Sequence, residues 1–292
     1  MLIWRKRHTD MNPTGAKASS STTASLPEAL QQEKWRSDLT AYIYIMFGLH
    51  AATRTEWQKV GDCNRKLEQR HKRQPLEGSL GSLAAYLRGA FDQGVGALDS
   101  AQGTFESPQF AIGGNTHRGE KGIEFGMSLL AALNRILIMQ DKNHRDDRKI
   151  AELIEQVEQA CVDYDDMEIR AAFHLTMAIS QMNPPLSIND LKQHLHVAIQ
   201  TTRRTNNTHC LSMALNTMRY RLFEDHVGEQ AVKSAKAGTA QAMKSGNLLW
   251  MSVAEFMCSK SYESRSQKQE AEQCFELGTQ YANESWARTQ YE

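Results

Sequence analysis

Residues 206–283 decide the fold, and they read NNTHCLSMALNTMRYRLFEDHVGEQAVKSAKAGTAQAMKSGNLLWMSVAEFMCSKSYESRSQKQEAEQCFELGTQYAN. Apolar residues recur in this stretch every three or four positions, which predicts amphipathic helices. Turn residues interrupt the pattern at 245–247 and 264–267. We therefore expect two consecutive pairs of antiparallel helices, with Thr208 capping the first helix.

The second of these pairs carries small and aromatic residues at a characteristic spacing. They are Ser259, Tyr262, Ala271, Phe275 and Gly278. This spacing is typical of the tetratricopeptide repeat, a helix-turn-helix unit of about 34 residues. One unit cannot bury its apolar face alone, so the pattern predicts a stack of similar units.

Residues 78–105 match the same pattern in part. Gly89 and Gly96 occupy the positions of the small residue and the turn glycine, while Ala101 and Phe105 occupy those of the second helix. Asp92 stands where the repeat usually has a tyrosine. We interpret this segment as an earlier and more degenerate layer of the stack.

The whole chain therefore predicts an all-α fold, a tetratricopeptide-like α-solenoid in which antiparallel helix pairs form a right-handed superhelix. We expect roughly a dozen helices in about six pairs and no strand. Residues 1–25 are rich in Ser, Thr, Lys and Arg and lack an apolar face, which predicts a disordered arm. Residues 26–292 then form the repeat domain, interrupted by a Gly-rich loop at 107–122.

Helix ends near the start of this domain are predicted from capping residues. Asp38 precedes the apolar sequence LTAYIYIMFGLHAA and is expected to begin a new helix there. Thr53 or Thr55 is expected to cap the following helix, which turns Trp57 and Val60 inward.

Charge and hydropathy exclude some functions. Lys plus Arg and Asp plus Glu both number 34, so the chain of 292 residues has no formal net charge. A nucleic-acid-binding domain usually has a basic excess, so direct sequence-specific DNA binding is not expected. No secretory signal is visible, and the apolar run 39–52 is too short to cross a bilayer. We expect a soluble protein that does not bind membranes.

Two basic clusters have two interpretations each. They are WRKRH at residues 4–8 and RKLEQRHKRQ at residues 65–74. Short basic clusters serve as nuclear-import signals in some proteins. Cations are also favourable in the last turn of a helix, and a solvated helix end is the simpler interpretation of residues 65–74.

No catalytic, metal or cofactor site is predicted. His194 and His196 are two positions apart, so on a helix they point to different faces and make a poor chelate. The cysteines are odd in number and lack a CxxC spacing, which favours packing roles in a reducing compartment. They are Cys63, Cys161, Cys210, Cys258 and Cys274, and all but Cys63 fall in clear helical patterns. We expect no enzyme activity and no cofactor.

The functional surface of an α-solenoid is usually its concave groove, lined by polar residues of the inner helices. Four polar residues of the late helices are candidates for binding a partner there: Asn216, Arg219, Lys260 and Glu263. Ordinary solvated residues would show the same pattern.

Several segments together resemble fungal members of the cohesin loading factor family. These segments are residues 42–60, 181–194, 207–223 and 228–255. The resemblance covers about residues 39–282 and is densest after Met182, while the N-terminal arm and residues 107–122 lie outside it. It implies an all-helical superhelix, in agreement with the repeat pattern. Members of this family are typically much longer, so we expect the chain to correspond to a C-terminal portion with an unrelated leader.

The resemblance also implies a function. It implies a non-catalytic adaptor subunit of the cohesin loader that clasps the N-terminal segment of the large HEAT-repeat loader subunit. Such an adaptor supports cohesin loading onto chromatin for sister-chromatid cohesion, in the nucleus. The alternative is a generic tetratricopeptide scaffold for protein-protein interaction in another nuclear or cytosolic complex.

Overall fold

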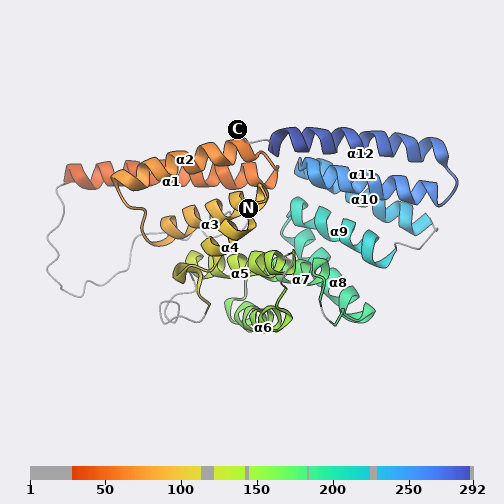
Figure 1. Cartoon of the computed structure of the whole chain (residues 1–292), viewed down its shortest axis with the longest axis horizontal. Coiled ribbons are helices and arrows are strands. Elements are labelled where there is room, and N and C mark those ends of the chain that lie inside the picture. The colour runs from red at the N-terminus through yellow and green to blue at the C-terminus, as the bar shows by residue number, and fades with distance from the viewer. Residues whose placement is uncertain (1–27, 113–121, 142–144, 183, 224–228, 290–292) are drawn as a thin grey trace.

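Helices make up the structure, a computed structural model that describes residues 28–112, 122–141, 145–182, 184–223 and 229–289 (Figure 1). Within these ranges the chain forms α-helices α1 to α12, one short 3-10 helix, η2, and no strand. In chain order they are α1 (Glu28–Thr53), α2 (Trp57–Arg73), α3 (Gly78–Gly94), α4 (Leu98–Phe105), η2 (Pro108–Phe110), α5 (Ile123–Asp141), α6 (Asp147–Tyr164), α7 (Met167–Ile179), α8 (Ile188–Arg204), α9 (Thr208–Leu222), α10 (Glu229–Ser245), α11 (Leu248–Glu263) and α12 (Lys268–Thr289).

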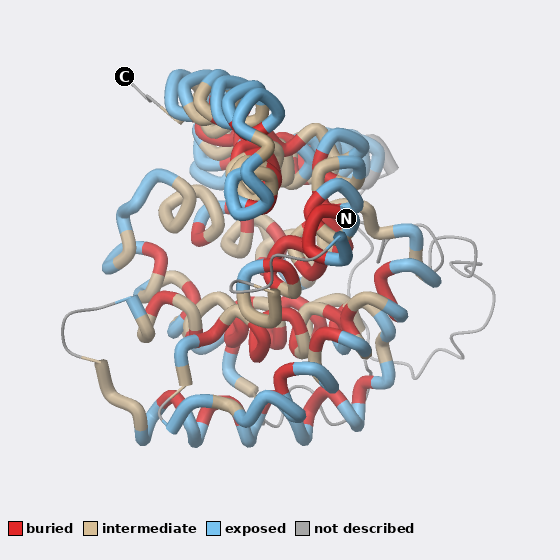
Figure 2. The backbone as a smooth tube through the Cα atoms, turned by 90° about the vertical axis from the view of Figure 1, so that its right-hand side faces the viewer, coloured by how far each residue is buried: buried red, intermediate tan, exposed pale blue. Residues whose placement is uncertain are grey.

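The predicted pairing of helices is confirmed. Each odd-numbered helix contacts the next even-numbered one, which gives six pairs, α1–α2 to α11–α12. The first helices of successive pairs also contact one another, from α1 and α3 to α9 and α11. This pattern of contacts between successive layers is that of an α-solenoid. Figure 2 shows the buried residues on the helix faces turned toward neighbouring layers and the exposed residues on the outer faces.

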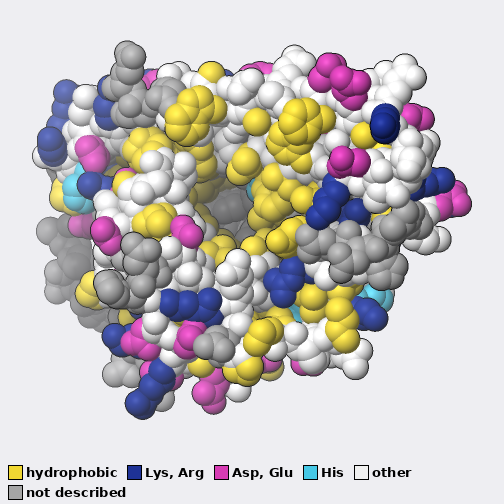
Figure 3. All heavy atoms as spheres, turned by 45° about the vertical axis from the view of Figure 1, so that its right-hand side comes forward, with side chains coloured by type: hydrophobic (Ala, Val, Ile, Leu, Met, Phe, Trp, Pro, Cys, Tyr) yellow, Lys and Arg dark blue, Asp and Glu magenta, His cyan; other side chains and the backbone are white. Residues whose placement is uncertain are grey.

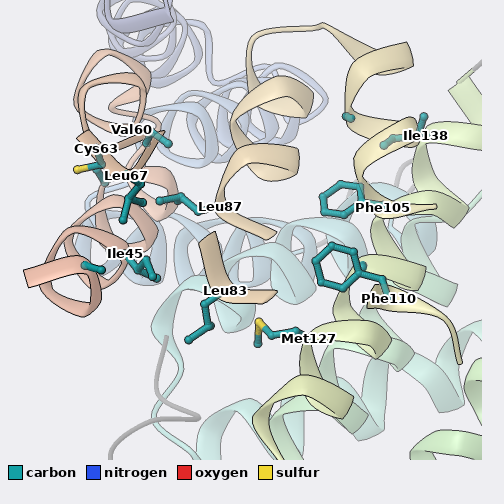
Figure 4. Close-up of a cluster of buried hydrophobic side chains, with 14 residues drawn as sticks. Ile45, Val60, Cys63, Leu67, Leu83, Leu87, Phe105, Phe110, Met127 and Ile138 are labelled. Atoms are coloured by element: carbon teal, nitrogen blue, oxygen red, sulfur yellow. The ribbon is translucent and has the colours of Figure 1, made fainter. Parts of the chain in front are cut away.

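The core of the first layers is built around a glycine and an aromatic ring. A Cβ atom at Gly89 of α3 would lie 2.6 Å from the ring of Phe105 of α4, so only glycine lets these helices approach so closely. Phe105 is fully buried, and Phe110 of η2 meets it edge-on with ring centroids 6.3 Å apart. Figure 4 shows these rings between Leu83 and Leu87 of α3 on one side and Ile138 of α5 on the other. Gly89 and Phe105 thus pack directly against each other between α3 and α4.

Small residues also bring α9 and α10 close together. A Cβ atom at Gly238 of α10 would lie 2.5 Å from Oδ1 of Asn216 of α9. The predicted glycine stop is present as well, because Gly246 has a φ of +67°, which glycine adopts without strain.

The first helix differs from the prediction. The helix α1 runs through Asp38 without a break, because the Asp38 carboxylate pairs with Arg70 of α2 instead of capping a helix. Neither Thr53 nor Thr55 caps α2, since their hydroxyls donate to the carbonyls of His50 and Arg54. Capping residues therefore did not predict these boundaries correctly.

Two later boundaries also depend on capping residues. Ser187 caps α8, with its Oγ accepting from the Asp190 N–H at 3.1 Å. Asn207, not Thr208, caps α9, because the Asn207 Oδ1 accepts from the Cys210 N–H at 3.1 Å. The predicted arm, residues 1–25, and most of the Gly-rich loop lie outside the described residues.

One helix in the described part of the chain, α5, is long and apolar enough to cross a membrane. Half of its apolar window is buried inside the fold, and Leu129, Ile136 and Ile138 are at most 1% exposed. These side chains pack into the hydrophobic clusters of the early and middle layers. The hydropathy of α5 is therefore explained by its place in the core of the stack.

Candidate partner-binding surfaces

The stack curves until its first and last layers meet. Figure 1 shows α1–α2 and α11–α12 end to end along the top of the view. The Asn247 side chain, at the start of α11, donates from Nδ2 to the carbonyl oxygen of Thr53, at the end of α1, over 2.7 Å. Arg288 of α12 forms an ion pair with Glu56, just before α2, at 3.6 Å. The two ends of the repeat domain are thus in direct contact.

One face of the molecule is hollowed. Figure 3 shows the hollow near the middle of this face, with hydrophobic side chains gathered around its mouth and charged side chains farther out. An apolar centre with a polar rim is the usual composition of a protein-binding surface. This arrangement suits a peptide segment better than a small charged ligand.

The four candidate residues fall into two groups. Lys260 and Glu263 are exposed in the last turn of α11. Asn216 and Arg219, which we expected on a polar face, are each only 1% exposed. The expectation that Asn216 and Arg219 face solvent was therefore wrong.

Arg219 is buried because it connects two layers. Its Nε donates to Oγ of Ser261 in α11 at 2.9 Å, and its Nη1 donates to the carbonyl oxygen of Phe223. A buried guanidinium needs such acceptors, because an unpaired charge in the interior is strongly unfavourable. The helical pattern of α9 does not reveal that Ser261, 42 residues farther along the sequence, accepts a hydrogen bond from Arg219.

Most of the repeat positions of the last pair lie between α11 and α12 and are buried or half-buried. The Ser259 hydroxyl donates to the carbonyl oxygen of Ala271 at 2.8 Å, and Ala271 is 8% exposed. A Cβ atom at Gly278 would lie 2.9 Å from the ring of Phe256, so Gly278 also permits close packing. Tyr262 is half-buried, with Nζ of Lys236 5.4 Å from its ring centroid.

Phe275 is the exception. It is 57% exposed, although the repeat pattern places an aromatic residue of the core at this position. Its ring lies 5.5 Å from that of Phe256, at the outer edge of the pair.

A second surface lies along the basic end of α2. One groove there is lined by Lys34 and Tyr44 of α1 and by Lys66 and Arg73 of α2. The Nζ atom of Lys66 lies 5.0 Å from the ring centroid of Tyr44, within the range of a cation–π contact. The helix is regular through residues 65–73, and Arg70 holds it to Ser37 of α1. This regular packing fits the simpler interpretation of the basic cluster, a helix end.

A pair of histidines joins α7 and α8. The Nδ1 atoms of His174 and His194 are 2.8 Å apart, so one imidazole donates and the other accepts. Burial, the neighbouring His194 and the Arg170 guanidinium lower the pKa of His174 to about 4. Burial also lowers the pKa of His194. Both rings are therefore neutral at pH 7, and the pair acts as a polar contact between helices.

The remaining histidines of α8 and α9 do not form a metal site either. Burial lowers the pKa of His209 to about 4. His196 lies on the exposed side of α8, so the HxH side chains point apart as expected. In the described ranges no three His, Cys, Asp or Glu side chains are grouped for metal binding.

The cysteines are packed rather than activated. Cys63 lies within α2 and is 4% exposed, so it too belongs to a helix, which the sequence had not indicated. Burial raises the pKa of Cys210 to about 11 and that of Cys161 and Cys274 to about 12. It also raises the pKa of Cys63 and Cys258. A thiol with a raised pKa is a poor nucleophile, because the thiolate is the reactive form.

Comparison with known proteins adds a family. The family model described as cohesin loading factor matches residues 10–269. This range begins within the predicted arm and includes residues 107–122, so the likeness is wider than the sequence segments indicated. No curated protein and no solved structure matches the chain.

Proposed function

Because the chain belongs to the cohesin loading factor family, and so has a role in cohesin loading, we propose that it is the non-catalytic adaptor of the loader. In this role it holds the N-terminal segment of the large HEAT-repeat loader subunit in the hollow of its curved stack. Family membership supports association with the cohesin loading complex and action on chromatin, and therefore a nuclear role.

The observation that carries this proposal is the curved stack itself. A segment without a fold of its own needs a long continuous surface, because ordering it costs conformational entropy. Helix pairs that curve around a hollow with hydrophobic side chains at its mouth offer such a surface (Figure 3). The contribution of the chain is then binding and positioning, with no chemical step.

Lys260 and Glu263 are the candidate contacts for the partner. Both are exposed in the last turn of α11 and present one positive and one negative charge to solvent. Contacts of this kind set orientation and association rate more than affinity.

The direct test is titration calorimetry of the full chain with the N-terminal segment of the large loader subunit from the same organism. We expect stoichiometric binding with a large negative heat-capacity change, the mark of extensive apolar burial. The HEAT-repeat body without this segment is the control and should not bind the chain. A folded, helical chain that fails to bind the segment would overturn the proposal and favour a scaffold in another complex.

A matched pair of charge reversals then tests the candidate contacts. The double variant Lys260→Glu with Glu263→Lys should slow association about threefold to tenfold at low salt. The control is Glu229→Lys with Lys233→Glu on α10, an exposed ion pair at 2.9 Å. Equal rates for both double variants would remove Lys260 and Glu263 from the binding surface.

A further inference from the structure

One contact between the first and last layers is made by the Asn247 side chain, which forms two hydrogen bonds. The Asn247 Oδ1 accepts from the Trp250 N–H at 3.0 Å and so caps α11. Its Nδ2 donates across the junction to the Thr53 carbonyl oxygen, which is 194 residues away in the sequence. Asn247 is only 3% exposed, so both bonds are shielded from water.

The second contact across the junction is ionic. Glu56 lies among three cations: Arg54 at 3.5 Å, Lys59 at 2.9 Å and Arg288 at 3.6 Å. Of these three, Arg288 alone comes from the last layer, and it also pairs with Glu284 of its own helix. About a third of the Arg288 side chain is exposed, so salt weakens this link.

The buried hydrophobic clusters of the described residues lie away from this junction. The largest buried clusters draw their residues from α1 to α7 and the smaller ones from α7 to α9. In the described ranges no such cluster joins α1 or α2 to α10, α11 or α12. The contacts named above between the first and last layers are thus polar, whereas buried hydrophobic clusters connect the early and middle layers.

The turn on the N-terminal side is rigid by itself. The Glu56 N–H donates to the Ala51 carbonyl at 3.0 Å and the Thr55 N–H to the Ala52 carbonyl at 3.1 Å. These bonds form a Schellman-type end to α1, with Thr55 at a φ of +57°. If the junction parts, the turn can keep its shape and the layers can separate as bodies.

We propose that the Asn247–Thr53 bond and the Glu56–Arg288 ion pair form a polar latch that opens and closes the ring of the stack. This inference rests on the proposed function, because an open latch admits an extended partner segment from the side and a closed latch retains it. Closure by a few polar bonds lets the ring open without unfolding any layer.

The test measures a distance across the junction, with spin labels at Asp62→Cys on α2 and Asn283→Cys on α12. Both parent residues are exposed. The reference labels are Glu155→Cys on α6 and Gln193→Cys on α8, at exposed sites in adjacent layers. The chain without introduced cysteines controls for labelling of the native thiols.

Two substitutions separate the latch from the folding of α11. Asn247→Asp keeps the oxygen that caps the helix and removes the donor to Thr53. Arg288→Gln removes the ion pair with Glu56 and touches no cap. We expect each variant, and salt raised from about 0.05 M to about 1 M, to lower the closed fraction by about half or more. The reference distance should not change.

An unchanged distance across the junction in both variants and in high salt would overturn the latch. That result would leave the proposed function intact, because no partner is present in this measurement. If the latch opens, Arg288→Gln should also speed association with the loader segment at least about threefold, since opening then precedes binding. A lower closed fraction in Arg288→Gln without faster association with the loader segment would overturn the role of the latch in partner entry.

Discussion

The pairs α3–α4 and α11–α12 carry the same repeat pattern and differ in how deeply they are buried. In both pairs a glycine lets an aromatic ring approach the backbone, Gly89 for Phe105 and Gly278 for Phe256. The aromatic residue of the second helix, however, is fully buried in the first pair, as Phe105, and 57% exposed in the last, as Phe275.

The two aromatic residues differ in burial because different neighbours surround them. Phe110 of η2 covers one side of Phe105, and Tyr86 of α3 covers another with ring centroids 5.7 Å apart. No described helix follows α12 to cover Phe275 in the same way. The spacing of residues thus fixes how two helices meet, and the next layer decides whether the outer aromatic is buried.

The largest expected effect separates these two aromatic residues. Phe105→Ala should lower the free energy of unfolding by about 3–5 kcal/mol, because it leaves a cavity in a packed core. Phe275→Ala should cost less than about 1 kcal/mol, since the ring already contacts water. Urea unfolding followed by circular dichroism measures both. Similar losses for the two variants would contradict the comparison.

The next effect tests what holds the last pair in place of a covering layer. Ser261→Ala should cost about 1–3 kcal/mol, because the buried Arg219 Nε loses its acceptor. The control is Ser264→Ala in the exposed turn after α11, which should change stability by less than about 0.5 kcal/mol. The same urea titration applies, and a neutral Ser261→Ala would show that Arg219 does not stabilise the last pair.

A smaller effect separates the two glycines. Gly89→Ala should destabilise by about 1–2 kcal/mol, because the fully buried Phe105 ring cannot move away from a new Cβ atom. Gly278→Ala should be nearly neutral, because Phe256 is only half-buried and alanine favours the helix by up to about 1 kcal/mol. Thermal melting of both variants decides the point, and a larger loss at Gly278 would be the contrary result.

The smallest effect concerns the layers between the two pairs. The pKa of His174 and of His209 lies near 4, below the unfolded value of about 6.5. The unfolded chain therefore binds protons more readily between these limits, and stability falls as pH falls. From pH 7 to pH 6 the loss should be about 0.7 kcal/mol for each histidine.

The matching variant is His174→Gln, which should flatten this pH dependence in urea titrations at the two pH values. Gln193→Ala, an exposed substitution on α8, is the control and should leave the slope unchanged. An identical slope in His174→Gln would show that the pair does not titrate on unfolding.

Local signals predicted much of the fold. The turn glycines Gly96 and Gly246 have positive φ, and Ser187 caps its helix, because these roles depend on a few adjacent residues. The repeat spacing also assigned Gly89 and Phe105 to the two helices of one pair, and these residues pack against each other.

Distant partners account for what the sequence did not predict. Asp38 pairs with Arg70, which is 32 residues away, so it does not start a helix. Arg219 looked like a surface residue because its acceptor, Ser261, lies two helices farther on. The contact between the first and last layers depends on the curvature of the whole stack, which no local pattern reports.

The five buried or half-buried thiols have a consequence for the chemistry of stress. At pH 7.4 a thiol with a pKa of about 12, such as Cys161 or Cys274, is a thiolate about once in ten thousand molecules or less. Peroxide and alkylating reagents attack the thiolate, so these cysteines should survive oxidant doses that inactivate redox-sensing proteins. Oxidation of these cysteines is therefore not expected to disturb the helix packing around them.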